Sequence, residues 1–541
     1  MVTALTGSKL IALALWIFGS IYSTCSILIY IEYGLAWPFN GGEFVYISKL
    51  FPSPPLLVET SFAWFFVSFS TSANNALMFA RFCILLANKE SEWLMKFVAC
   101  VITIAISLLH YRLLSIGIAA NNILATYKAG LLLVFVLAGL VAVCQEGAHR
   151  NLRGSSDFSS MYPDPSSSER SNWCYKEPAS QDSKEGQVSG ANVALAALLV
   201  LYSYQGWENS NYVASEIEGT PSQQRRVLKR GALLAVTVVS SLYILFNFLL
   251  FWLLSFGEIV ESSSTTAAVA FAVRAFHQRE SLAKTSIYVC IALSSCGNLI
   301  GVIFTNARVK RDIAIQRIIP FPIMFARSST YGRNRGDMLG TPTGGLLLHA
   351  LATCITIASV PDYGDGIHEG IMFVINLFTY GHAILQIILG IGLIFLKKRM
   401  EDNETHRHDP ANSKGPYEEK WPWDYNILDR TWKRLTTGAI FILVNAFVVV
   451  MPLVPTTSLL DGCPRRIKIF YLPITVISIL GFKQTKGPME GDFVPHSARR
   501  VWWEEMSWRF QGKNEIMTRL RANYEKDTAR ELRMPSIDDR S

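Results

Sequence analysis

The sequence predicts an all-α integral membrane protein that crosses the bilayer about eleven times, and three observations predict this class. Half of the 541 residues are hydrophobic and only 17% are charged, which is not the usual balance of a soluble globular protein. Apolar stretches of about 20 residues, enough to cross a hydrocarbon core of about 30 Å, recur from end to end. Helices are expected because lipid offers no water to satisfy backbone polar groups.

The apolar stretches give the spans in order. We predict them at 10–30, 57–87, 96–114, 124–144, 192–215, 231–255, 284–306, 344–360, 369–396, 437–455 and 467–482. Together they form one transmembrane domain over residues 1–482. No cleavable signal peptide is expected, because the first stretch is too long for the apolar part of one and lacks a convincing basic lead.

Four segments are too polar to lie in lipid. Residues 145–190, rich in Ser, Pro and charge, predict a flexible extracellular loop. Residues 307–343 and 397–436 predict cytoplasmic connectors. Residues 483–541 predict a cytoplasmic tail, in which the tryptophans 502, 503 and 508 leave both an interfacial amphipathic helix and a solvated tail open.

The basic residues indicate orientation more than a nucleic-acid partner. The net charge is +8, but the Lys and Arg residues cluster beside apolar stretches at 225–230, 308–335 and 397–399. Such clusters mark cytoplasmic connections, so no nucleic-acid binding is expected and the partner is the lipid bilayer. The sequon at Asn403 then lies in the cytoplasm and is expected to carry no glycan.

The fifth span contains the main candidate site. An apolar run from Ala191 to Leu201 leads into a polar and aromatic cluster around a glycine, followed by a short polar half-helix to Ile217. The cluster consists of Tyr202, Ser203, Tyr204, Gln205, Gly206, Trp207 and Glu208. A helix broken there frees backbone amides and carbonyls at mid-membrane depth, which is tolerated only where they line a cavity. The cluster therefore predicts a substrate-binding site.

Each of these residues also has a purely structural interpretation. Gly206 is compatible with close helix packing, and Glu208 with a structural ion pair. The aromatic residues Tyr202, Tyr204 and Trp207 are compatible with core or interfacial packing. The nine cysteines show no paired C-x-x-C spacing and lie mostly in apolar stretches, so no metal site and no cofactor are expected.

Three motifs carry a family resemblance. Residues 202–207 resemble the F-A-Y-x-G-W stretch in the sixth helix of amino acid–polyamine–organocation permeases, especially the L-type amino-acid transporter and fungal methionine permease branch. Residues 38–46 resemble the family's P-x-x-G-G-x-x-x-Y, and Arg308 and Pro320 resemble the ends of its S-R…L-P segment. The similarity covers about residues 10–480.

The resemblance implies a fold of two inverted five-helix repeats plus two extra helices, with substrate held between broken first and sixth helices. Tyr202 would then be the aromatic gate, and the backbone from Ser203 to Gln205 would receive the substrate's α-amino group. Gly41, Gly42 and Arg308 would form the cytoplasmic gate. Glu208 stands where related carriers place an amide, which favours a cationic substrate or proton coupling.

One departure concerns the start of the chain. The span 10–30 and the following Ile31-Glu32-Tyr33-Gly34 resemble the second helix of the family, so its broken first helix, with a G-S-G-type turn, has no counterpart. We expect this amino-terminal helix to be absent, either from the gene model or in reality.

The resemblance implies a secondary active transporter and not an enzyme. It would move neutral L-amino acids such as methionine by alternating access, driven by protons or exchange, in the plasma membrane. The alternative is a non-transporting nutrient sensor or an inactive truncated permease. Whether an accessory subunit takes part stays open.

Overall fold

The computed structural model describes residues 2–51, 57–89, 91–150, 190–217, 221–261, 264–276, 279–328, 341–360, 367–407 and 427–450. Within these ranges the regular elements are helices, which confirms the predicted all-α class for this part of the chain. The helices are α1 (Val2–Thr6), α2 (Lys9–Ala36), α3 (Glu43–Leu50), α4 (Leu57–Phe69), α5 (Ala73–Leu86), α6 (Glu92–Arg112), α7 (Leu114–Arg150), α8 (Gly190–Tyr204), α9 (Asn209–Tyr212), η2 (Ala214–Glu216), α10 (Pro221–Leu253), α11 (Phe256–Glu261), α12 (Ser264–Phe276), α13 (Glu280–Ile315), α14 (Pro322–Phe325), α15 (Thr343–Ser359), α16 (Ile367–Arg407) and α17 (Thr431–Val450).

Seven of the described helices are long and apolar enough to cross a membrane, namely α2, α6, α7, α10, α13, α16 and α17. They correspond to seven of the predicted spans. Helices α8, α12 and α15 contain shorter apolar stretches. The predicted span 467–482 and the predicted tail 483–541 lie outside the described residues. The chain is a multi-pass membrane protein.

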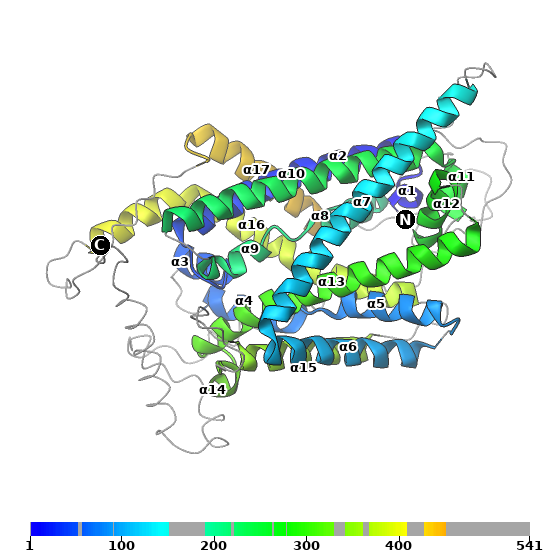
Figure 1. Ribbon diagram of the computed structural model, residues 1–541. Helices are drawn as coiled ribbons and strands as arrows, with labels where there is room; N and C mark the ends of the chain where they lie inside the picture. Colours follow the sequence, from blue (N-terminus) through cyan, green and yellow to red (C-terminus); the bar gives the residue numbers. More distant parts are fainter. Residues whose placement is uncertain are drawn as a thin grey trace, which may run out of the picture.

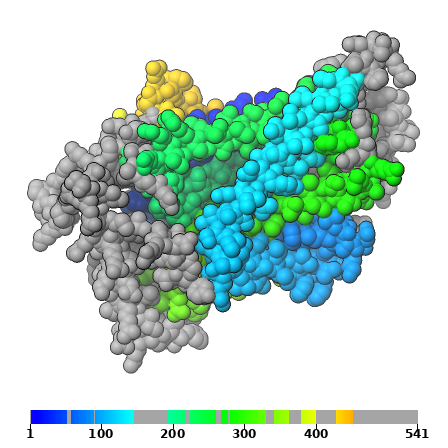
Figure 2. All heavy atoms as spheres, viewed as in Figure 1, coloured from blue at the N-terminus to red at the C-terminus, as the bar shows by residue number. Residues whose placement is uncertain are grey.

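The long helices pack around a broken segment. Figure 1 shows α2 and α10 side by side, with α13, α5, α6 and α15 on the other side of the molecule. The short helices α8 and α9 run through the interior between these two groups and contact α2 and α13 respectively. Figure 2 shows α7 lying across one face over α10 and α13, helices with which it packs.

The predicted single span 57–87 is wrong, because the structure divides it into α4 and α5. The division lies at Ser70-Thr71-Ser72. Asn306 donates to the carbonyl of Ser70 at 3.3 Å and to its hydroxyl at 2.9 Å. The Ser72 hydroxyl lies 2.5 Å from His349 Nε2 on α15. The amide of Ser72 donates to the hydroxyl of Thr353 on α15 at 3.3 Å, so side chains of α13 and α15 pair with backbone groups at the break.

Several helices continue past the predicted span ends. Helix α13 extends to Ile315 and keeps Arg308 and Lys310 buried inside the protein, so the predicted connector 307–343 begins as helix. Helix α7 extends to Arg150 and α16 to Arg407, into the predicted polar segments 145–190 and 397–436. The remainder of those segments, 151–189 and 408–426, lies outside the described residues.

Helix α6 has an exposed apolar stripe along one side and a buried face on the other. Its exposed apolar side chains, Trp93, Phe97, Val101, Ile104 and Leu108, recur every three or four residues and form one stripe. The opposite face is buried against α5 and α15. An apolar stripe of this length facing outward is the surface expected of a helix in contact with lipid.

Candidate functional site

The predicted break in the fifth span is present in the structure. Helix α8 ends at Tyr204, residues 205–208 are not helical, and the chain resumes as α9 at Asn209. Gly206 has a φ of +135°, a backbone conformation that is essentially confined to glycine. An apolar, buried helix thus ends where glycine and polar side chains replace it, so the break is encoded locally.

Nearby side chains hold the unwound backbone. The carboxylate of Glu208, which is only 6% exposed, accepts a hydrogen bond from the amide of Gly206 at 3.2 Å. The side-chain amide of Asn209 donates to the carbonyl of Gly206 at 3.1 Å. On α13, the hydroxyl of Thr305 donates to Asn209 Oδ1 at 3.0 Å. Both backbone polar groups of Gly206 are therefore paired with polar side chains.

The predicted site residues point in different directions. Asn74 on α5 donates to the hydroxyl of Tyr202. The hydroxyl of Ser203 donates to the carbonyl of Leu199, one turn back, at 2.9 Å. Gln205, Gly206 and Glu208 lie in the break itself.

Two of the predicted residues belong to the aromatic core. Tyr204 is buried, donates from its hydroxyl to the carbonyl of Trp16 at 3.0 Å and packs against the Trp16 ring. Trp207 is buried with its ring edge-on to Tyr22, at a centroid distance of 5.7 Å. For these two side chains the structure agrees with the core-aromatic interpretation, and their backbone still belongs to the break.

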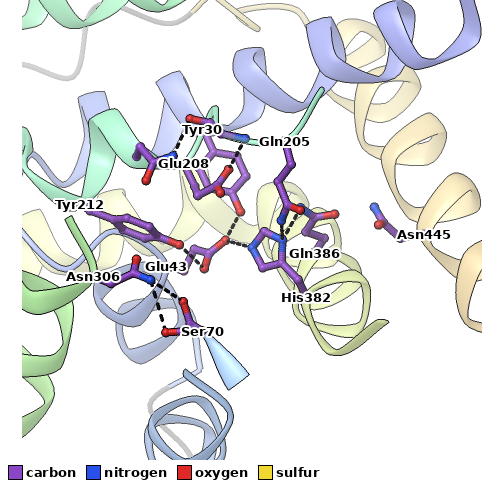
Figure 3. Close-up of polar contacts among 12 residues, drawn as sticks. Tyr30, Glu43, Ser70, Gln205, Glu208, Tyr212, Asn306, His382, Gln386 and Asn445 are labelled. Atoms are coloured by element: carbon purple, nitrogen blue, oxygen red, sulfur yellow. Dashed lines mark hydrogen bonds and ion pairs between the residues drawn. The ribbon is translucent and has the colours of Figure 1, made fainter. Parts of the chain in front are cut away.

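A buried acid–base pair lies beside the break (Figure 3), and sequence reasoning did not single it out as part of the site. Glu43 at the start of α3 is 0% exposed and His382 on α16 is 2% exposed. His382 Nε2 lies 2.7 Å from Glu43 Oε1. The hydroxyl of Tyr30 also donates to Oε1, and that of Tyr212 on α9 donates to Oε2 at 3.2 Å.

Three donors therefore stabilise one buried carboxylate. Removing a charge from water costs several kcal/mol even after the protein relaxes. Hydrogen bonds to a charged group return about 1.5–3 kcal/mol each, so three of them return about 5–9 kcal/mol. The two amounts are of similar size, so the three donors offset much of the cost of burying this side chain.

The other nitrogen of His382 faces two amides (Figure 3). Its Nδ1 lies 2.6 Å from Gln205 Nε2, in the break, and 3.1 Å from Gln386 Nε2, one turn along α16. The oxygen of Gln386 accepts from the Tyr22 hydroxyl at 2.6 Å. With both amide groups donating to Nδ1, the network assigns the ring proton to Nε2, which donates to Glu43.

The two predicted gate glycines form the turn between α2 and α3. Their φ angles are +99° for Gly41 and +49° for Gly42. The amide of Gly41 donates to the carbonyl of Tyr212 at 3.3 Å. A Cβ on Gly42 would lie 2.6 Å from a ring carbon of Tyr212. Both glycines are therefore required for close contact with the end of α9.

Arg308, the third predicted gate residue, reaches the same segment from α13. Its guanidinium pairs with the carboxylate of Glu216 in η2. Asn40 accepts a hydrogen bond from the amide of Ser215 at 3.0 Å. All three predicted gate residues thus converge on residues 212–216, directly after the broken span.

The site that the structure assembles is polar and non-covalent in character. Among the described residues, no group of three or more His, Cys, Asp or Glu side chains is placed to hold a metal ion. The residues that sequence reasoning missed are Glu43, His382 and Gln386. For Glu43 and His382, the signal that could have found them is an ionisable side chain inside or next to an apolar stretch, which often marks a functional site in membrane helices.

Comparison with known proteins identifies the family. A family model described as amino acid permease matches residues 1–480. The high-affinity methionine permease of Saccharomyces cerevisiae is 23% identical over 457 residues, covering 84% of this chain and 68% of the relative. The low-affinity methionine permease of the same yeast is 22% identical over 399 residues, covering 74% and 66%. The human b(0,+)-type amino acid transporter 1 is 23% identical over 333 residues, covering 57% and 59%.

The chain thus spans about two thirds of the length of the yeast permeases that it matches. The family match extends over most of the sequence and includes the helices, the break and the three predicted gate residues described above. This chain belongs to the amino acid permease family.

Proposed function

We propose that this protein transports amino acids across a membrane by alternating access, as a secondary active transporter. The observation that carries the proposal is the break between α8 and α9, an unwound segment in the interior of a membrane protein. Unwound backbone at this depth can bind the ammonium or carboxylate group of an amino acid without covalent chemistry. Membership of the family supports the same substrate class, and no step in the proposal requires an enzyme's reaction.

The proposed binding site comprises the backbone from Ser203 to Gln205 and the side chains of Tyr202 and Glu208. The ammonium group of the substrate would approach the carbonyls at the end of α8, where the helix dipole is negative. Neutral L-amino acids such as methionine are the proposed substrates, on the similarity to the yeast methionine permeases. The plasma membrane is the proposed location, and the two inverted five-helix repeats are part of the proposed architecture.

The segment 212–216 is the proposed cytoplasmic gate. It follows the break directly and is tied to the turn of Gly41 and Gly42 and to Arg308. A movement of α9 that opens a path to one side of the membrane would have to release these contacts. In this proposal, the contacts made and the contacts released would be the two alternative states that alternating access requires.

Counterflow in proteoliposomes tests the proposed function. Vesicles containing the full chain and unlabelled methionine should accumulate external labelled methionine in a saturable manner, and leucine should compete. A chain that binds methionine without any counterflow would instead be a sensor. A chain that neither binds nor moves any amino acid would contradict the proposed function.

Glu208→Gln tests the role of the buried acid. We expect uptake by this variant to lose its pH dependence or its preference for cationic substrates, because the substitution removes an acidic group at the break. Glu258→Gln is a matched control, since Glu258 lies in the short helix α11 between longer apolar segments and not at the break. Unchanged pH dependence and substrate preference of uptake in Glu208→Gln would contradict this part of the proposal.

A further inference from the structure

We propose that His382 and Glu43 form a proton-carrying site, and that Gln205 links the protonation of His382 to the conformation of the break. The inference rests on the proposed function, because a coupled proton needs a transported substrate. His382 and Glu43 lie outside the seven predicted positions of the fifth span, and the inference assigns them the driving reaction, whereas Gln205 is one of the seven.

The first support is the burial of an ionisable pair within the membrane domain. Glu43 and His382 are 0% and 2% exposed, and their contact joins α3 to the apolar helix α16. A buried acid and base in contact can exist with one proton more or one proton fewer, and ionisable groups at this depth commonly belong to proton pathways. The pair changes from a net charge of −1 to zero when His382 takes up a proton at Nδ1.

The titratable groups that face the pair come from each neighbouring element. Tyr30 of α2 and Tyr212 of α9 donate to Glu43, and Tyr46 of α3 lies within electrostatic range of it. Glu208 of the break lies within electrostatic range of both His382 and Glu43. Two acidic side chains thus lie within electrostatic range of one buried imidazole.

The second support is the side-chain amide of Gln205, which contacts Nδ1 of His382 through its nitrogen. In the neutral state, Nδ1 of His382 accepts from the amide nitrogen of Gln205. The oxygen of that amide, Gln205 Oε1, is buried and has no hydrogen-bond partner in the part of the chain that the structure describes. If Nδ1 is protonated, a half-turn of the Gln205 amide presents Oε1 to the new N–H group. The proton is then satisfied, and the orphaned oxygen gains a partner.

Gln386 cannot make this exchange as easily, because its own oxygen already accepts from the hydroxyl of Tyr22. Tyr22 is held in turn by Asn445 of α17, whose amide donates to the Tyr22 hydroxyl at 2.9 Å. The response to protonation is therefore directed to Gln205, the residue between the end of α8 and Gly206. A proton at His382 changes the contacts of the break, which is the differential interaction that coupling requires.

The test measures proton and methionine fluxes together in proteoliposomes that contain a pH-sensitive dye. In the wild type, methionine added outside should carry protons inward. In His382→Gln, which can still donate to Glu43 but cannot carry a charge, the methionine-driven proton flux should fall by about tenfold or more. Methionine counterflow at equal pH, measured on the same vesicles, gives the methionine flux by which the proton flux is divided.

A matched control is His110→Gln. His110 is also a buried histidine, but it lies on α6 and contacts the carbonyl of Ile300 at 3.1 Å and not Glu43 or Gln205. Its proton flux per methionine should equal that of the wild type. A His382→Gln protein with wild-type proton flux, or a wild type that moves methionine without protons, would overturn the inference. Absence of counterflow in the wild type would refute the proposed function and not this assignment alone.

A second measurement needs no variant at all. Calorimetric titration of the wild-type protein with methionine, in two buffers of different ionisation enthalpy, reports the protons taken up on binding. The observed heats should differ in proportion to the buffer enthalpies. Equal heats in both buffers would contradict the coupling, even if His382→Gln failed to fold.

Discussion

Replacement of Gly206 by alanine isolates the contribution of the break. The steric cost of the added methyl group is small, because its nearest neighbour would be Asn209 Nδ2 at 3.5 Å, an ordinary van der Waals distance. The backbone cost is larger, because a residue other than glycine at a φ of +135° is strained by about 1–3 kcal/mol. Relief of that strain favours a different conformation of residues 205–208.

This free energy sets the size of the expected defect. If substrate binds only to the observed break, a penalty of about 1–3 kcal/mol weakens binding by about 5- to 150-fold. The assay is the concentration dependence of methionine counterflow, supported by direct binding of labelled methionine to purified protein. Both the half-saturating concentration and the dissociation constant should rise by the same factor.

Gly231→Ala provides the matched control for this experiment. Gly231 lies within helix α10, and nothing lies within 4 Å of a Cβ built there. Alanine in a helix interior is favoured over glycine by about 0.5–1 kcal/mol, so this variant should melt at the same temperature or higher and transport normally. Wild-type methionine affinity in Gly206→Ala would refute the idea that the glycine-specific backbone shapes the binding site.

Two further predictions concern stability. Gly345→Ala should destabilise the protein by about 1–3 kcal/mol, because its Cβ would lie 2.0 Å from the carbonyl oxygen of Ala307 and would force α15 away from α13. The control is Gly130→Ala, where nothing lies within 4 Å of the added Cβ. Equal melting temperatures of the two variants would contradict this prediction. The pKa of Glu258 lies below its ordinary value, since hydrogen bonds from Ser255 and the charge of Arg274 outweigh the effect of burial. A lowered pKa stabilises the folded state above the ordinary pKa, and this contribution is lost as pH falls through the lowered one. Because the side chain of Glu258 is 38% exposed, its contribution to stability should stay below about 1 kcal/mol. The melting temperatures of Glu258→Gln and the wild type should therefore converge at acidic pH. A difference in melting temperature that grows at acidic pH would contradict this prediction.

Features that depend on a local run of residues could be predicted from the sequence. The seven long apolar helices follow from stretch length alone, and the break at Gly206 follows from a glycine among polar residues after an apolar run. The turn of Gly41 and Gly42 was also recognisable. What the sequence could not show is its contact with Tyr212, more than 160 positions away along the chain.

Features created by distant contacts were not predictable from local patterns. The division of α4 from α5 depends on Asn306 and His349, which lie 236 and 277 positions from their partners Ser70 and Ser72. The pair of Glu43 and His382 joins residues 339 positions apart. Each residue is an ionisable side chain in or next to an apolar stretch, but only the packing of α16 against α3 gives the two a common site.

The length of α6 bears on the thickness of bilayer that this helix can cross. The helix has 21 residues and is therefore about 32 Å long, with the charged residues Glu92 and Arg112 at its two ends. A helix of this length is long enough to cross a hydrocarbon core of about 30 Å, and a thinner bilayer is accommodated by tilting or by local changes in the lipid. The acyl-chain length of the lipids used for reconstitution therefore affects the tilt of α6 relative to α5 and α15, the helices on which it packs. We expect lipids of matching thickness to leave this packing unchanged.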